Sequence, residues 1–239
     1  MTEIAYPGSE LELFAQATNW KRYWSSMIRP YLGRRVLDVG AGIGATIDLL
    51  RAPSQERWVA LEPDPDLAAR LVAKAAKAGE GEGFETRIGT IADLGGDERF
   101  DTILYIDVLE HIPDDRAELA RAAARLEPGG RVIVLSPAHQ WLFSPFDAAI
   151  GHERRYTRSS LRAVAPDALA CERLIYLDSV GMILSLANRL LLRSAMPTAG
   201  QIAFWDRRIV PVSRILDRLA ARRLGKTVIG IWRRSEHAA

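Results

Sequence analysis

A glycine-rich loop that follows a short apolar run is the part of this sequence best suited to bind a nucleotide-like cofactor. Its residues are Gly40, Ala41, Gly42, Ile43 and Gly44. Glycine adopts positive φ angles and lets a ligand lie directly against the backbone. Because Ala45 completes the dinucleotide pattern G-x-G-x-x-G/A, the loop alone does not decide which nucleotide cofactor it holds.

Two acidic residues narrow the choice of cofactor by their charge. Asp38 stands two residues before the first glycine. A carboxylate there is unfavourable beside the pyrophosphate of a dinucleotide and favourable beside a ligand that carries an ammonium and a sulfonium. Glu62 ends the next predicted strand, where it can accept hydrogen bonds from both hydroxyls of a ribose. The alternative for Glu62 is a charge that stabilises a helix N-terminus.

Histidines supply the candidates for acid–base chemistry on a second ligand. His111 follows the predicted fourth strand, in the segment Leu109–Pro113. A histidine titrates near neutrality and can take a proton from an attacking hydroxyl or amine. The alternative is that His111 faces the cofactor at the rim of the site, and we expect Glu110 to have a structural role.

A second polar block follows the predicted fifth strand. In it His152 is another candidate base, and Tyr156 can orient the nucleophile. Either Arg154 or Arg155 can bind an anionic acceptor through its two-pronged guanidinium. The alternative is that Asp147 pairs with Arg155 and only fixes the loop.

The elements that must position these residues follow an α/β pattern. Short β-branched runs alternate with segments whose apolar residues recur every three or four positions, which is typical of a parallel sheet with helices on both faces. The predicted strands are Arg35–Val39, Arg57–Leu61, Glu85–Ile88, Asp101–Ile106, Arg131–Leu135, Arg173–Leu177 and Thr227–Arg233. The predicted helices are Ile43–Arg51, Asp66–Lys77, Asp115–Leu126 and Ser159–Val164, with a turn at Gly79–Gly83.

An N-terminal helix, roughly Leu11–Ile28, precedes the first predicted strand. Trp20, Tyr23 and Trp24 lie on about one face of it. Such a stripe usually packs into a core. The alternative is a lid that closes over the cofactor, in which Tyr23 or Trp24 touches the ligand.

About fifty residues separate the last two predicted strands, far more than an ordinary connection needs. This insert contains an apolar helical segment, Met182–Leu192, and a basic amphipathic one around Arg207–Arg223, with Pro197 and Pro211 as boundaries. We favour a cap whose apolar side is buried on the sheet and covers an acceptor cavity. The alternative is a helix in a lipid interface, with its arginines at the level of the phosphates.

Composition excludes several classes of protein. The 239 residues are 48% hydrophobic and 26% charged, which is enough to bury a core and argues against global disorder. From residue 181 onward eleven Lys and Arg face three Asp and Glu, whereas the preceding residues carry 21 against 27. This basic C-terminal part favours an anionic partner, such as a phosphate, a lipid headgroup or a nucleic acid.

Localisation and metal content follow from simple sequence features. The single cysteine, Cys171, can form no internal disulfide and no cysteine-based metal site, and we expect no bound metal. We find neither a signal-peptide pattern nor an apolar run of about 20 residues. We therefore expect a cytoplasmic protein, with peripheral membrane contact through residues 207–223 as an alternative.

Four motifs in order carry a resemblance to a known family. They are Asp38–Gly44, Glu62–Asp64, Phe100–Ile112 and Leu126–Arg131. On these the chain resembles class I S-adenosylmethionine-dependent methyltransferases of the small-molecule, type 11/12-like kind over nearly its whole length. The resemblance implies a Rossmann-like sheet of seven mostly parallel strands, with the last strand antiparallel between the fifth and sixth. We expect one domain over 1–239, with an N-terminal lid (1–30), a core (31–178), a helical insert (179–225) and a last strand with a tail (226–239).

The same resemblance implies how the chain holds S-adenosylmethionine and its product S-adenosylhomocysteine. Asp38 and the loop Gly40–Gly44 would hold the methionine end, and Glu62 the ribose. Thr90 stands where the family usually has an aspartate that recognises adenine, so adenine recognition is expected to rest on Thr90 and on apolar packing. The other expected contacts with the cofactor are Pro63, Ile91, Ile106, His111 and Tyr23.

The expected reaction is methyl transfer to an oxygen or nitrogen of a small acceptor, either a natural product or a quinone-like or glycolipid-related molecule that is anionic or lipid-linked. Such a reaction is an in-line displacement that needs proximity, alignment and exclusion of water. The expected catalytic residues are His111, His152, Arg155 and Tyr156. Alternatives are an NAD(P)-dependent oxidoreductase, a non-catalytic cofactor-binding regulator and a nucleic-acid methyltransferase, the last disfavoured because no aromatic stacking platform accompanies the basic charge. The sequence indicates no oligomeric state.

Overall fold

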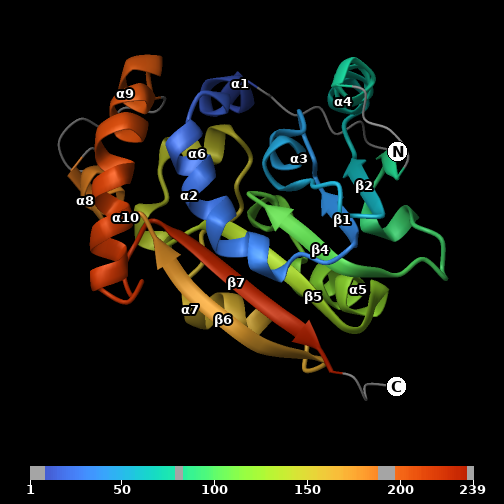
Figure 1. Ribbon diagram of the computed structural model, residues 1–239. Helices are drawn as coiled ribbons and strands as arrows, with labels where there is room; N and C mark the ends of the chain where they lie inside the picture. The colour runs from blue at the N-terminus through green and yellow to red at the C-terminus, as the bar shows by residue number, and fades with distance from the viewer. Residues whose placement is uncertain (1–8, 79–82, 188–196, 236–239) are drawn as a thin grey trace.

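A twisted seven-stranded sheet forms the centre of the protein (Figure 1). The computed structural model describes residues 9–78, 83–187 and 197–235. The strands are β1 (Arg35–Val39), β2 (Arg57–Glu62), β3 (Phe84–Ile88), β4 (Phe100–Ile106), β5 (Leu126–Pro137), β6 (Leu169–Leu177) and β7 (Thr227–Arg234). The α-helices are α1 (Ser9–Ala15), α2 (Thr18–Ile28), α3 (Ala45–Leu50), α4 (Pro65–Ala78), α5 (Asp115–Arg125), α6 (Pro145–Ala149), α7 (Arg158–Val164), α8 (Ser179–Ala187), α9 (Ala199–Phe204) and α10 (Val210–Leu219).

The sheet has the order β3-β2-β1-β4-β5-β7-β6. Neighbouring strands from β3 to β5 are parallel, and β7 is antiparallel to both β5 and β6. The predicted mixed sheet, with its last strand between the fifth and sixth, is confirmed. All seven predicted strands are present, although β5 and β6 begin several residues earlier than predicted.

The helices agree less closely with the sequence prediction. The single N-terminal helix is in fact two, α1 and α2, with an interruption before Thr18. Pro211 does not end a helix: α9, a π-helical turn (Trp205–Ile209) and α10 follow one another without a break, and Pro211 occupies the first turn of α10. Most of the predicted turn at 79–83 and the end of the predicted helix Met182–Leu192 lie outside the described residues.

Strand alternation divides the core into two layers, one on each face of the sheet. In β1, Leu37 and Val39 belong to the layer that α5 and α7 cover. Val36, which precedes Leu37 and points to the opposite face, belongs to the layer covered by α2, α3 and the insert. Asp38 shares the parity of Val36, so its side chain also points into this second layer, and it is 1% exposed.

A carboxylate of the insert caps helix α2 from a distance in sequence. The residue before α2 is Ala17, which has no side-chain acceptor for the first free amides. Asp206 takes that role: its carboxylate accepts hydrogen bonds from the backbone amides of Asn19 at 3.2 Å and Trp20 at 2.8 Å. These amides are the ones that an N-cap side chain normally satisfies. Asp206 is 3% exposed, so this contact is buried.

Helix α8 begins in the same way. The carboxylate of Asp217, on α10, accepts hydrogen bonds from the amides of Asp178 at 2.6 Å and Ser179 at 2.9 Å, and Ser213 Oγ accepts one from Val180 at 3.2 Å. Asp217 and Ser213 are both fully buried. Helix α10 therefore turns a polar stripe toward the protein.

The opposite stripe of α10 is apolar and faces outward. Its residues and exposed fractions are Val212 (47%), Ile215 (63%), Leu216 (43%) and Leu219 (78%). The prediction that this amphipathic segment buries its apolar side on the sheet is wrong. The reason is that the N-terminus of α8 requires acceptors, and the side chains of α10 that supply them, Ser213 and Asp217, must point inward.

Removing the carboxylate of Asp206 is expected to destabilise the protein and to loosen α2. We expect Asp206→Ala to lower the free energy of unfolding by about 2 kcal/mol, because two buried amides lose their acceptor. Urea denaturation measures this loss, and hydrogen exchange of the Asn19 and Trp20 amides locates it. The control is Asp114→Ala, which removes an exposed N-cap of α5 and should cost less stability without affecting those amides. An equal loss of stability in the two variants, with unchanged hydrogen exchange of the Trp20 amide in Asp206→Ala, would contradict the capping role of Asp206.

Candidate functional site

One large cavity lies over the carboxyl ends of the central strands. Its volume is about 1800 Å³. Single small-molecule sites are usually about 300–1000 Å³, so this cavity has room for a cofactor and a second ligand. The glycine loop, the turn after β4, the segment after β5, α2 and the insert all contribute to its wall.

The glycine loop forms one end of the cavity. Gly40, Ala41 and Gly42 line it, whereas Gly44 precedes α3 and does not belong to the wall. Gly40 has a φ of +66°, and a Cβ on it would lie 2.7 Å from Cγ2 of Val108. Only glycine fits there, so the backbone remains bare toward the ligand space.

Glu62 stands beside this loop, as predicted. It lines the cavity and is 5% exposed. Its carboxylate accepts hydrogen bonds from the amides of Gly42 at 2.8 Å and Asp64 at 3.0 Å, which orient it and leave oxygen lone pairs for a ligand. Burial raises the pKa of Glu62 above its usual value.

Asp38 lies behind the loop and not in the cavity wall, which corrects the expectation of direct contact with the cofactor. Its Oδ2 has no hydrogen-bond partner among the described residues. Burial, with the nearby charge of Glu62, raises the pKa of Asp38 to about 8. The carboxyl group is therefore mostly protonated at neutral pH in the chain without a ligand.

The predicted adenine contacts are partly brought together. Pro63 and Thr90 line the cavity, and so does Ala92. Ile91 instead turns into the core, where it is fully buried. The Thr90 hydroxyl donates a hydrogen bond to Asp93 at 2.8 Å as part of a capping box.

Helix α2 contributes to the wall with other residues than predicted. Trp20, Lys21 and Trp24 line the cavity. Tyr23 does not, because its hydroxyl donates a hydrogen bond to Asp217 at 2.9 Å on the side of the insert. Tyr23 thus fastens α2 to α10, and the expectation that it contacts the cofactor is wrong.

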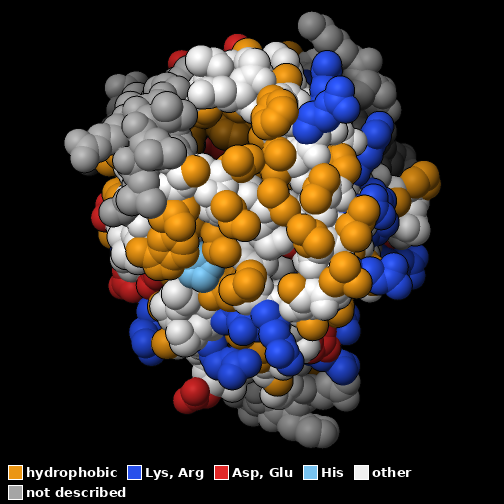
Figure 2. Space-filling model, turned by 90° about the vertical axis from the view of Figure 1, so that its left-hand side faces the viewer, with side chains coloured by type: hydrophobic (Ala, Val, Ile, Leu, Met, Phe, Trp, Pro, Cys, Tyr) orange, Lys and Arg blue, Asp and Glu red, His pale blue; other side chains and the backbone are white. Residues whose placement is uncertain are grey.

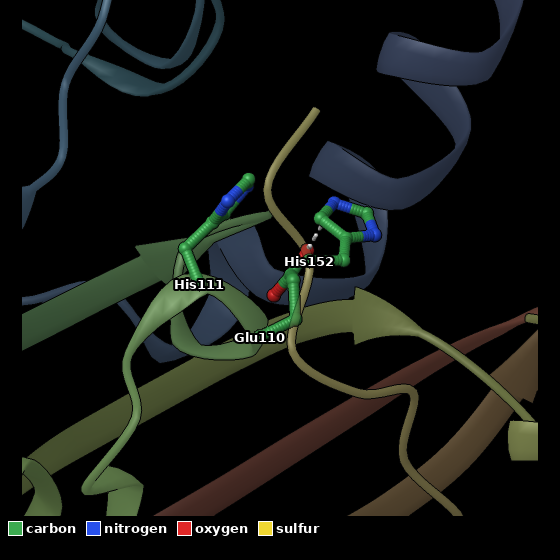
Figure 3. Close-up of side chains that lie close together, drawn as sticks. All are labelled: Glu110, His111 and His152. Carbon is green, nitrogen blue, oxygen red and sulfur yellow. Dashed lines mark ion pairs between the residues drawn. The ribbon is translucent and has the colours of Figure 1, made fainter. Parts of the chain in front are cut away.

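Three titratable side chains lie close together after β4 and β5, as Figure 3 shows. Glu110 and His111 come from the turn after β4, and His152 comes from the segment that leads to Tyr156. The rings of the two histidines lie edge to face with centroids 4.6 Å apart. His152 Nε2 is 3.8 Å from Oε1 of the fully buried Glu110. Burial raises the pKa of Glu110 well above its usual value, while burial and His152 lower the pKa of His111 to about 4.

Asp147 holds two of the predicted catalytic residues. Its carboxylate lies 2.9 Å from His152 Nδ1 and accepts two hydrogen bonds from Arg155, at 2.8 and 2.9 Å. Burial alone would raise the pKa of Asp147, but these hydrogen bonds and the charge of Arg155 keep it well below the usual range. The alternative in which Asp147 pairs with Arg155 is confirmed, although both His152 and Arg155 also line the cavity.

Tyr156 lies outside the cavity. Its hydroxyl donates a hydrogen bond to Asp115 at 2.6 Å, and Arg154 forms an ion pair with the same carboxylate at 2.8 Å. Tyr156 is 2% exposed. It therefore cannot orient a nucleophile, and that prediction is wrong.

The sequence interpretation missed several features of the cavity. Ligand atoms of Glu110, His111 and His152 lie within 4.8 Å of one another, so these three side chains can hold a metal ion that we did not expect. Lys226 and Trp205 also line the cavity. On this side the sequence had predicted Ile106, His111, His152 and Arg155.

Comparisons with known proteins agree with this architecture. Residues 14–177 match a family model described as a methyltransferase domain. Ubiquinone biosynthesis O-methyltransferase from Bradyrhizobium sp. is 32% identical over 177 residues, which cover 69% of this chain and 68% of that protein. The protein of the same name from Paramagnetospirillum magneticum is 38% identical over 107 residues, 44% of this chain and 41% of that protein. A geranyl diphosphate methyltransferase in complex with S-adenosylmethionine superposes with a TM-score of 0.66 at 14% identity, over 98% of this chain and 93% of that one.

The chain belongs to the class I S-adenosylmethionine-dependent methyltransferase family. S-adenosylmethionine is therefore its cofactor. The residues present fit that molecule. The glycine backbone is open toward the cavity and suits the amino-acid end of the cofactor, and the carboxylate of Glu62 faces the cavity and suits the ribose. The insert begins where the matched segment ends, at residue 177.

The raised pKa of Asp38 predicts a pH-dependent stability. Between about pH 4 and pH 8 the folded chain keeps a proton on Asp38 that the unfolded chain releases, so this residue makes the protein less stable as pH rises through that window. Relative to Asp38→Asn, the wild-type free energy of unfolding should fall with pH, by about 1.4 kcal/mol per unit at the steepest point. Urea denaturation without cofactor, from pH 5 to pH 9, measures both proteins. If the free energies of unfolding of wild type and Asp38→Asn change in parallel with pH, the raised pKa of Asp38 is contradicted.

Proposed function

We propose that this protein transfers a methyl group from S-adenosylmethionine to a hydroxyl oxygen of a small phenolic acceptor of the quinone-precursor type. The observation that carries the proposal is the position of His152, a cavity-lining histidine whose Nδ1 is held by Asp147 at 2.9 Å. The names of the two relatives support an oxygen acceptor.

A phenol must lose its proton to become a strong nucleophile. A base serves this role when it borders the ligand space and a third group fixes its ring. Asp147 fixes the ring of His152 in this way, and His111 packs against it from the turn after β4. Arg155 contributes indirectly, since its two hydrogen bonds keep Asp147 in place. Bound S-adenosylmethionine would supply the activated methyl group at the glycine-loop end.

A divalent metal ion is a second way to activate the same hydroxyl. His111 and His152 offer two nitrogen ligands at the cavity wall, and the buried Glu110 beside them offers one oxygen ligand. An ion held there would bind the acceptor oxygen and lower its pKa. The two mechanisms place the acceptor oxygen in the same corner of the cavity, but they differ in their response to a chelator.

Methyl transfer to 4-methylcatechol tests the function. We expect His152→Ala to lower kcat by about 100-fold or more, because the group that accepts the proton is lost. Stabilisation by S-adenosylhomocysteine should be unchanged. His139→Ala is the matched control, since His139 is not among the described residues of the cavity wall.

Two further outcomes decide the mechanism and the reaction. Loss of activity in EDTA, restored by a divalent ion, would assign activation to a metal and not to His152 as a base. Methylation of amines with no transfer to any phenol would contradict the proposed function.

We also propose that the insert binds an anionic membrane surface, so that an acceptor with an apolar tail enters from the lipid. Figure 2 shows apolar side chains spread over the face formed by α8, α9 and α10, with Lys and Arg side chains at its margins. The exposed apolar residues of this face include Ile183, Leu184, Phe204, Ile215 and Leu219. Exposed apolar area rimmed by arginine is typical of a lipid-binding surface.

The patch is continuous with the cavity, which is why a lipid is the expected occupant. Leu184 and Phe204 are 39% and 57% exposed, and both also line the cavity. Arg207, Arg208 and Arg214 are exposed close to them in the chain and complement anionic headgroups. In the described chain no helix has the length and apolar character to cross a bilayer, so the proposed contact is peripheral.

Co-sedimentation with phosphatidylglycerol vesicles tests this surface. We expect Ile215→Asp with Leu219→Asp to weaken binding at least tenfold, because two apolar side chains and charge balance are lost together. The matched control is Val72→Asp, an apolar side chain of similar exposure (53%) on α4. High salt should weaken wild-type binding. An equal effect of both variants, or no binding to anionic vesicles, would contradict the proposal.

A further inference from the structure

Lys226 brings a positive charge to the wall of the acceptor half of the cavity. It directly precedes β7, whose first residue Thr227 pairs with Pro137 at the end of β5. Its side chain is 24% exposed and lines the cavity. Its Nζ lies 4.1 Å from the centre of the Trp205 ring, a cation–π contact that fixes the ammonium in place.

The carboxylate next to Lys226 forms an ion pair with it and also has three other hydrogen-bond donors. Asp178 is fully buried and accepts hydrogen bonds from Gly181 N at 3.0 Å, Ser213 Oγ at 2.5 Å and Trp205 Nε1 at 2.7 Å. Lys226 Nζ is farther away, at 3.4 Å. Charge-assisted hydrogen bonds are usually about 2.7–2.9 Å long. Asp178 does not belong to the described cavity wall, so Lys226 is the member of this pair that faces a ligand.

The other Lys and Arg side chains of the described wall also bond to protein groups, so Lys226 does not differ from Arg121 or Lys21 in having a protein partner. The guanidinium of Arg155 donates two hydrogen bonds to Asp147. Arg121 bonds to Glu118 at 3.4 Å, and Lys21 donates to the carbonyl of Ala15 at 3.0 Å. An ammonium has three N–H donors. Lys226 therefore keeps donor capacity toward the cavity.

Sheet order places Lys226 too far away to serve the cofactor. Neighbouring strands are about 4.8 Å apart, and β7 is the third strand from β1 and the second from β4. The start of β7 thus lies about 14 Å from the glycine loop and about 10 Å from the turn that carries His111. An aromatic ring with substituents on opposite sides spans much of the latter distance.

We propose that Lys226 is a specificity residue that binds an anionic substituent of the acceptor, across the aromatic ring from the oxygen that is methylated. The orientation of the acceptor in this inference rests on the proposed function. The binding of an anionic group by Lys226 does not depend on it. The acceptor class is thereby narrowed from phenols in general to phenols with a carboxylate or an equivalent anionic group. Trp205 and Asp178 hold the ammonium in position before the acceptor binds.

Two probes that differ in charge test the proposal by calorimetry in the presence of S-adenosylhomocysteine. They are 3,4-dihydroxybenzoate and its neutral analogue 4-methylcatechol. We expect wild type to bind the anion at least about tenfold more tightly, since a charge-assisted contact is added. Lys226→Met should remove this preference and Lys226→Arg should keep part of it. Lys21→Met, which alters a lysine near the cofactor loop, should keep the preference.

Each result has a single reading. Stabilisation by S-adenosylhomocysteine reports that a variant is folded, and Lys226→Gln is measured in parallel in case Lys226→Met is not. A wild type without charge preference, or a preference that persists in both neutral variants, overturns the proposal. Charge preference without methyl transfer to either probe or to other phenols would overturn the proposed function and leave the role of Lys226 standing.

Discussion

Buried carboxylates on backbone amides hold the acceptor half of this protein together. Asp206 caps α2, and Asp217 caps α8 and also accepts the hydroxyl of Tyr23. A carboxylate can remain buried only when donors replace its lost hydration, and the free amides of a helix N-terminus are suitable donors. Because each bond joins two segments that are distant in sequence, α2 and the insert form one roof over the cavity.

The same constraint accounts for the outward apolar stripe of α10. An amphipathic helix normally turns its apolar side to the core. Here Ser213 and Asp217 must point inward to satisfy the first turn of α8, so Ile215 and Leu219 must point outward. The exposed apolar area of the insert is thus a consequence of polar requirements inside the protein.

The fold and most of the cofactor end could be predicted because their signals are local. Residues adjacent in the chain specify each of these features: the apolar runs that form strands, the glycines with positive φ, and Glu62 at the end of a strand. The burial of Asp38 was also within reach: alternation along β1 gives it the parity of Val36, which places its side chain in the core layer under α2 and α3. The prediction from the sequence therefore placed Asp38 too close to the cofactor, because the residue lies outside the cavity wall.

The acceptor end could not be predicted, because its contacts join residues far apart in the chain. Tyr23 is 194 positions from its partner Asp217, and Tyr156 is 41 from Asp115. The sequence does not indicate whether the hydroxyl of a tyrosine on a cavity-facing helix will hydrogen-bond toward the cavity or toward another part of the protein. In the sequence, Lys226 is only one of several basic residues in the C-terminal part. Its contact with the Trp205 ring depends on the fold.

Two ends of one cavity therefore follow different rules. The cofactor end is built from the segment that matches the family, and its bare glycine backbone fits one kind of molecule. The acceptor end combines this segment, which supplies His111 and His152, with the insert, where apolar wall residues such as Leu184 and Phe204 also reach the surface. An acceptor with an apolar tail could stay in contact with apolar surface from the lipid to the cavity, while its polar ring meets His152 and Lys226. Only the polar ring would then have to be desolvated, and the protein supplies hydrogen-bonding groups at that point.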